Sequence, residues 1–119
     1  MTNKAHQLGQ EGEKSAAAFL LSRGYEVLYT SYRHGRAEID LVVRQGQALL
    51  VFVEVKARSS SQFGYPETFV TERKKQLFRL AAEHLQHELA WTGDIRFDIL
   101  AVTPTAEGLR VEHFEDAFY

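Results

Sequence analysis

Apolar positions recur every three or four residues in two parts of the chain, which is the spacing of an amphipathic helix. The first part runs from about residue 6 to residue 23 and is followed by Gly24, a residue type that commonly ends a helix. The second runs from about residue 72 to residue 90, and Thr71 in front of it is suited to cap its N-terminus. The pattern therefore predicts two helices, whose apolar stripes are Leu8, Ala16, Phe19 and Leu20, and Leu77, Phe78, Ala81, Leu85 and Leu89.

Segments rich in β-branched and aromatic residues predict five strands, over residues 25–32, 38–43, 49–57, 95–102 and 109–114. The turns between the first three are short, so we expect an antiparallel meander. The connection through the second helix to the fourth strand is long enough for a crossover between parallel strands. The expected fold class is α/β, with one domain over residues 1–119 and a mixed central sheet flanked by helices.

Charged residues interrupt two of the predicted strands. Because side chains alternate across a strand, Glu54 and Lys56 share one face of the third strand. In the second strand the alternation assigns Ile39, Leu41 and Val43 to one face and Glu38, Asp40 and Val42 to the other. If the two strands are neighbours, Asp40 lies beside Glu54, and two carboxylates and an ammonium meet at the ends of central strands.

Asp40 and Glu54 would repel each other if both lost solvent, so they must be paired, protonated or bound to a cation. Lys56 offsets only one of them, whereas a divalent metal offsets both, and oxygen ligands suit Mg²⁺ or Mn²⁺. Glu13 should point from the first helix toward the sheet, as a third carboxylate for the site. The alternative reading is a solvent-facing Glu–Lys ion pair and a surface acid near a helix start.

Charge, cysteine content and the length of apolar runs limit the kinds of binding, chemistry and location that the chain can have. The chain has 119 residues, a net charge of −2 and a pI of about 6.2, so any contact with nucleic acid must rely on a local basic patch. It has no cysteine, which excludes disulfides, thiolate zinc sites and cysteine nucleophiles and fits a reducing cytosol. No apolar run is long enough to span a bilayer, and the N-terminus lacks a secretory signal. We therefore expect a cytoplasmic protein.

These acids, in this order, resemble the PD-(D/E)XK nuclease superfamily, whose restriction-endonuclease-like αβββαβ fold is shared with archaeal Holliday-junction resolvases. Over nearly its full length the chain resembles more closely the YraN family of small bacterial endonucleases. The matching motifs are GQEGEKSAA, SYRHGRAEIDLV, VFVEVKAR, FG at residues 63–64, VTERKKQ, RFDILAV and the terminal EDAF. Ser31 stands where that family usually has Asn, which is expected to weaken a backbone or phosphate contact, and Ala37 stands where it has Gly.

The resemblance implies a Mg²⁺- or Mn²⁺-dependent endonuclease that hydrolyses DNA, with branched or single-stranded DNA as candidate substrates. It implies that Asp40 and Glu54 hold the metal, with the Val55 carbonyl as a further ligand. Glu13 would bind a second metal or a metal-bound water, and Lys56 would position the attacking water.

Other residues have supporting roles in this interpretation. Arg33, Arg58 and Lys74 are expected to bind nucleic acid, while Arg73 and Lys75 fit a solvated helix turn better. Glu38 and Gln76 are auxiliary candidates, and Glu38 could instead pair with Arg36 as a surface residue. The apolar tail with Phe114 and Phe118 suggests a homodimer, as in the resolvases. A nucleic-acid-binding module without useful activity, and an adaptor domain with mere ion pairs, remain alternatives.

Overall fold

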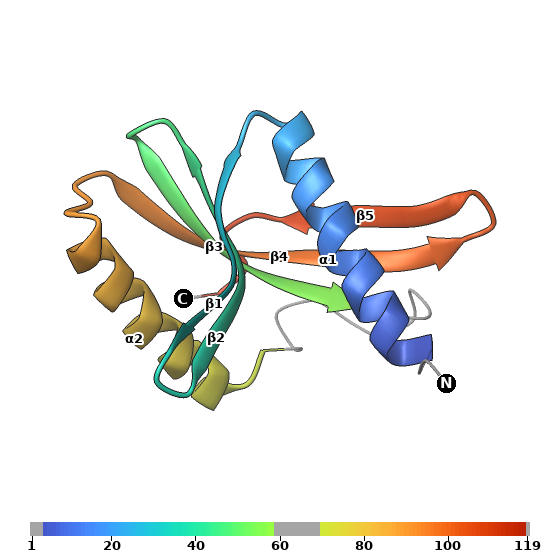
Figure 1. Cartoon of the computed structure of the whole chain (residues 1–119), viewed down its shortest axis with the longest axis horizontal. Helices are drawn as coiled ribbons and strands as arrows, with labels where there is room; N and C mark the ends of the chain where they lie inside the picture. The colour runs from blue at the N-terminus through green and yellow to red at the C-terminus, as the bar shows by residue number, and fades with distance from the viewer. Residues whose placement is uncertain (1–3, 59–69, 119) are drawn as a thin grey trace.

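The computed structural model describes residues 4–58 and 70–118, and the side chains from residue 7 onward. The predicted FG motif lies outside the described residues. The described elements follow the predicted order (Figure 1): helix α1 (Lys4–Ser22), strands β1 (Glu26–His34), β2 (Ala37–Gln45) and β3 (Leu49–Ala57), helix α2 (Glu72–Glu88), and strands β4 (Asp94–Thr105) and β5 (Gly108–Phe114). Thr71 caps α2 as expected, since its hydroxyl accepts a hydrogen bond from the Lys74 N–H at 3.1 Å.

The strands form one sheet in the order β1-β2-β3-β4-β5. The first three strands are an antiparallel meander, β3 and β4 are parallel, and β5 pairs antiparallel with β4. The connection that contains α2 makes the parallel crossover, and the two helices lie on opposite sides of the sheet (Figure 1). The predicted α/β class, the mixed sheet and the αβββαβ order of the core are confirmed.

The core has one apolar layer on each face of the sheet. The alternation predicted for β3 holds, because Leu50 and Phe52 pack on the α2 side while Val51 and Val53 pack on the α1 side. Phe118 also lies in the α2-side layer, where its ring stacks on that of Phe97. The apolar tail thus packs in the core, and the homodimer stays a prediction.

The alternation predicted for β2 is wrong at Ile39. This residue packs in the α2-side layer with Val42, whereas Leu41 and Val43 pack on the α1 side. The pairing of β2 with β3 ends at Leu41 and Val53. Beyond that pair β3 no longer holds β2 flat, so a residue two positions away is not kept on the same face.

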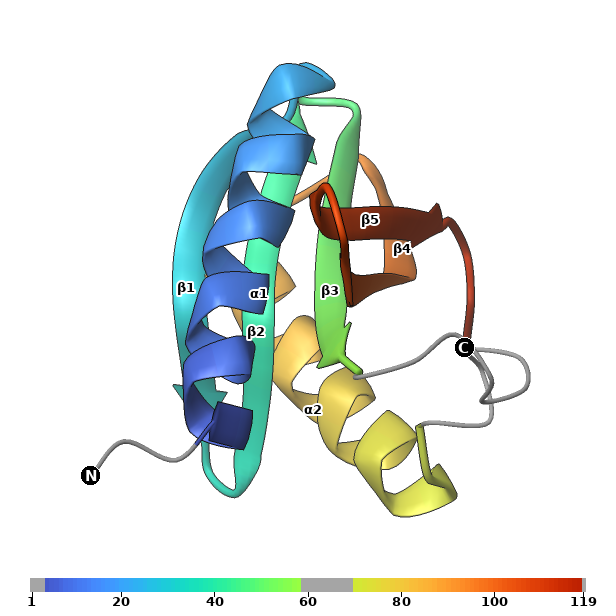
Figure 2. The ribbon, with the colours of Figure 1, turned by 90° about the vertical axis from the view of Figure 1, so that its right-hand side faces the viewer.

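Helix α1 approaches the sheet closely at Gly12. A Cβ atom at this position would lie 3.2 Å from the Cβ of Ala57 and 3.6 Å from the Cβ of Val102. A larger residue would therefore push α1 away from β3 and β4. Figure 2 shows α1 running along the sheet, with α2 on the far side of the strands. Neither helix, over the described residues, has the length and apolarity needed to cross a membrane.

Candidate functional site

The two predicted carboxylates meet where β2 and β3 separate. Their ladder ends at the pair Leu41 and Val53, and Asp40 and Glu54 are the next residue on each strand. The Oδ2 atom of Asp40 accepts a hydrogen bond from the N–H of Val55 at 2.8 Å. This bond fixes Asp40 on the β3 backbone, one residue from Glu54.

Glu54 is a buried acid with unequal oxygens. Its side chain is 3% exposed, and Oε1 lies 2.7 Å from the Lys74 ammonium and 3.6 Å from that of Lys56. Within the described part of the chain, Oε2 is buried and has no hydrogen-bond partner. Since leaving a buried carboxylate oxygen unpartnered is costly, its chemistry fits coordination by a divalent cation.

Burial and mutual repulsion disfavour the ionised forms of the acids at this site. Burial, with the charge of Glu54 as the second cause, raises the pKa of Asp40 to about 7, although the Val55 N–H and Lys74 oppose this. Burial also raises the pKa of Glu13, and the charges of Glu38 and Glu54 add to the effect. A cation bound among these acids would relieve the repulsion.

Glu13 reaches this acidic group from α1, on the other side of the sheet. It is half-buried next to Gly12, and its charge acts on Asp40. It lines a cavity of about 340 Å³ together with Gln10, Lys14, Ala17, Thr30, Ser31 and Leu41. The expectation that Glu13 points toward the sheet is therefore met by its position.

A second cavity, of about 410 Å³, opens on the α2 side of Asp40. Its lining consists of Arg36, Glu38, Asp40, Thr71, Arg73, Lys74, Leu77 and Phe78. Lys74 reaches the site as predicted. Sequence reasoning missed Arg36 as a cation of this site. Arg73 is exposed in the first turn of α2, as predicted, and also lines this cavity. The signal available for Arg36 was its place just before the strand that carries Asp40.

Arg33 and Arg58, both predicted to bind nucleic acid at the site, form their ion pairs with acids other than Asp40 and Glu54. Arg33 is exposed and forms an ion pair with Glu38 at 3.1 Å, so Glu38 pairs with Arg33 and not with Arg36. The Arg58 side chain is only 10% exposed, and its guanidinium lies 3.3 Å from the Thr103 hydroxyl and 3.8 Å from the Glu112 carboxylate. Arg58 thus contacts β4 and β5. Gln76 is exposed on α2, and Lys75 pairs with Glu72 at 3.3 Å.

Ser31 has a left-handed backbone conformation beside the site, with φ of 49°. It lies between Thr30, which pairs with Leu41, and Tyr32, which pairs with Ile39, so it is opposite Asp40. Asn adopts this conformation more readily than Ser does. The Asn expected here from the resemblance thus has a backbone reason that sequence reasoning did not find.

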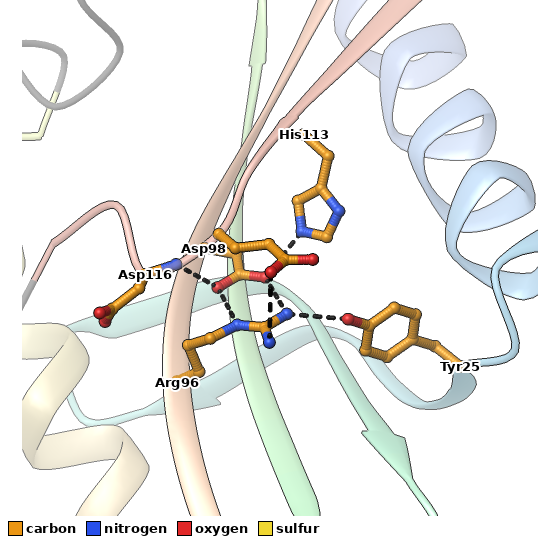
Figure 3. Close-up of polar contacts among 6 residues, drawn as sticks. Tyr25, Arg96, Asp98, His113 and Asp116 are labelled. Atoms are coloured by element: carbon orange, nitrogen blue, oxygen red, sulfur yellow. Dashed lines mark hydrogen bonds and ion pairs between the residues drawn. The ribbon is translucent and has the colours of Figure 1, made fainter.

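A separate buried acid, Asp98 on β4, carries a network that the sequence did not reveal (Figure 3). Its carboxylate accepts two hydrogen bonds from the Arg96 guanidinium, at 2.8 and 2.7 Å, and one from the Asp116 N–H at 2.9 Å. His113 Nε2 lies 2.7 Å from Oδ2, and Arg96 also donates to the Tyr25 hydroxyl at 2.8 Å. The network ties β4, β5, the C-terminal segment and Tyr25, the residue before β1, together.

The described residues contain no group of three or more His, Cys, Asp or Glu side chains arranged to hold a metal ion. The site presents a pair of acids with a third nearby, and not an all-protein cage. This ligand count suits Mg²⁺, which usually keeps several waters and binds one or two carboxylates plus substrate phosphates.

Comparison with known proteins gives matches over nearly the whole chain. The profile of "Uncharacterised protein family UPF0102" matches residues 12–102. The UPF0102 protein FP2501 of Flavobacterium psychrophilum is 42% identical over 114 residues, covering 96% of this chain and 95% of the relative. A UPF0102 protein of Christiangramia forsetii is 36% identical with the same coverage. The solved structure of Pyrococcus furiosus SfsA in complex with Ca²⁺ is 16% identical, with a TM-score of 0.40, and the match spans 93% of this chain and 63% of that one.

Proposed function

The chain belongs to the UPF0102 family, and from the acids that its fold brings together we propose that it is a divalent-metal-dependent endonuclease acting on DNA. One observation carries this proposal. The Oε2 atom of Glu54 is buried without a hydrogen-bond partner among the described residues, beside Asp40, whose pKa is raised to about 7. A buried carboxylate oxygen without a hydrogen-bond partner, next to a partly buried acid with a raised pKa, supports a cation-binding role.

Asp40 and Glu54 would hold Mg²⁺ or Mn²⁺, with the Val55 carbonyl as a further ligand. When bound, the ion supplies a Lewis acid that stabilises the charge developing on the phosphoryl oxygens. The hydrogen bond from Val55 orients Asp40 for this role before any ligand arrives. Pre-oriented groups of this kind need little rearrangement during the reaction.

Lys56 and Glu13 would act on the water. The Lys56 ammonium lies 3.6 Å from Glu54 Oε1 and its side chain is 32% exposed, so it can donate hydrogen bonds to a water at the edge of the site. Glu13 can accept a hydrogen bond from the same water, and its raised pKa makes it a better proton acceptor. Together they would orient the water toward the scissile phosphorus.

The cavity on the α2 side would take the DNA strand. Arg36, Arg73 and Lys74 supply positive charge, and the partly exposed Leu77 supplies apolar surface. Phosphate groups need the cations, while sugars and bases can use the apolar part. With a net charge of −2, attraction would be limited to this patch.

Cleavage assays test the proposal. Branched, single-stranded and duplex DNA are incubated with Mn²⁺ and wild type, Asp40→Ala, Lys56→Ala or the exposed-helix control Glu83→Gln. The control should cut like wild type, and each site variant at least about 100-fold more slowly. Equal cutting by all four proteins would show contamination and refute the assignment.

A binding module without useful activity is the second candidate, and one observation favours it. The Lys74 ammonium lies 2.7 Å from Glu54 and already neutralises part of the acidic pair. This candidate predicts salt-dependent DNA retention that Asp40→Ala leaves unchanged, with no cleavage under any metal.

A further inference from the structure

Glu54 has two lysines near the same oxygen, and the closer one comes from another element. Lys74 of α2 lies 2.7 Å from Oε1, within hydrogen-bond distance, whereas Lys56, two residues from Glu54 on β3, lies 3.6 Å away. The closest positive charge to Glu54 is therefore the one predicted to bind nucleic acid.

Lys74 also lines the cavity that contains Arg36 and Arg73. Its side chain is 36% exposed, so it lies between the buried carboxylate and the solvent-open cavity. A lysine has a flexible stem and three donors, which lets the ammonium move between two anionic partners a few ångströms apart. Glu54 is one such partner, and a phosphate in the cavity would be the other.

We propose that Lys74 is a positioning residue that couples metal binding to DNA binding. Without ligands it neutralises Glu54. When a DNA phosphate enters the cavity, Lys74 turns to the phosphate and leaves Glu54 to a divalent cation. This inference rests on the proposed function, because it takes Glu54 as a metal ligand.

Because Lys74 and a divalent cation compete for Glu54, metal binding and DNA binding should strengthen each other. A divalent cation that binds Glu54 alone must displace the Lys74 ammonium and bind beside its charge, which weakens metal binding. DNA removes that competitor, so the metal binds more tightly to the DNA complex. By linkage, the metal strengthens DNA binding by the same factor.

A purely structural ion pair predicts something else. If Lys74 only holds α2 on the sheet, its loss should loosen the site and weaken the binding of metal and DNA alike. If Lys74 instead competes with the metal for Glu54, its loss should strengthen metal binding and weaken DNA binding. Opposite signs in two assays therefore separate the interpretations.

The first assay is calorimetric titration of the DNA-free protein with Mn²⁺. Lys74→Met, which keeps the stem and removes the charge, should bind Mn²⁺ about tenfold more tightly than wild type. Lys75→Met is the matched control, since Lys75 is the next residue on α2 and pairs with Glu72. It should bind Mn²⁺ like wild type. Lys74→Gln is a second variant that serves if Lys74→Met does not fold.

The second assay measures binding of a fluorescent twelve-nucleotide single-stranded DNA in EDTA. Lys74→Met should bind it about fivefold more weakly than Lys75→Met, because one phosphate contact is lost. Unchanged or weaker Mn²⁺ binding by Lys74→Met, with measurable binding by wild type, would overturn this inference alone. If neither wild type nor Lys74→Met binds Mn²⁺, the proposed function fails and the inference falls with it.

Discussion

Asp98 and Glu54 are buried acids on the neighbouring parallel strands β4 and β3, and they differ in how many polar partners their carboxylate oxygens have. Asp98 is 0% exposed, and both of its oxygens have two polar partners from Arg96, His113 and the Asp116 N–H (Figure 3). Glu54 is 3% exposed, yet its two lysines share one oxygen and the other has no hydrogen-bond partner in the described part of the chain.

The pKa values of the acids in the two regions shift in opposite directions, in line with this difference. Burial pushes the pKa of Asp98 upward, but the hydrogen bonds from His113, Arg96 and Asp116 outweigh it and hold the pKa below its ordinary value. At Asp40 burial and the charge of Glu54 prevail and raise the pKa to about 7. The Asp98 region is complete without a ligand and serves stability. The Asp40–Glu54 region carries an electrostatic strain that a cation would relieve.

The largest effect should come from breaking the complete network. Asp98→Asn keeps the shape but leaves the partly buried Arg96 guanidinium without the carboxylate that accepts its two hydrogen bonds, so the free energy of unfolding should fall by about 3 kcal/mol. Urea denaturation at pH 7 measures this. The control Glu115→Gln, an exposed residue 3.8 Å from Arg96, should change it by less than about 0.5 kcal/mol. A small effect of Asp98→Asn would refute the stabilising role.

An Asp-to-Asn change at Asp40 should raise the free energy of unfolding, whereas the same change at Asp98 should lower it. Asp40→Asn keeps an acceptor for the Val55 N–H and removes the repulsion with Glu54. At pH 8 the free energy of unfolding should rise by about 1 kcal/mol, while Mn²⁺ no longer stabilises the protein against heat. A loss of stability comparable to that of Asp98→Asn would show that the two acids are alike.

The pH dependence sharpens the contrast. The ordinary value for Asp40 is 3.8 and its folded pKa is about 7, so between these values the folded state holds a proton that the unfolded state releases. This group therefore lowers stability as pH rises through that window. The stability advantage of Asp40→Asn over wild type should grow from pH 4 to pH 7 in urea denaturation. A constant difference would contradict the raised pKa.

The smallest effect should come from the backbone beside Asp40. Ser31→Asn suits the left-handed conformation and should raise the free energy of unfolding by about 0.5 kcal/mol. Ser31→Ala is the control, because alanine has no preference for this conformation. Thermal unfolding compares the two variants, and equal melting temperatures would argue against backbone strain at Ser31.

The sequence predicted the elements and the acid pair because both depend on local alternation. Along β3 every second residue is apolar and faces a helix layer, so Glu54 and Lys56 could be assigned to one face. The short turns set β2 beside β3, which brought Asp40 to Glu54.

The rest depends on contacts that no local pattern records. The partners of Asp98 include Arg96 two residues away and His113 fifteen residues away, and Arg96 contacts Tyr25, which lies just before β1. Arg58 follows the site in sequence, but its guanidinium contacts residues of β4 and β5. Ile39 changes face because β2 leaves β3 at that point. Strand divergence and tertiary pairing decide these features.

The most direct test of the shared cation is a crystal structure of the protein soaked in Mn²⁺, with anomalous diffraction to locate the ion. We predict a peak between the carboxylates of Asp40 and Glu54, with Lys74 moved away from Glu54 Oε1. Mn²⁺ bound elsewhere, with this pair empty and Lys74 still on Glu54, would contradict the claim that a divalent ion completes the site.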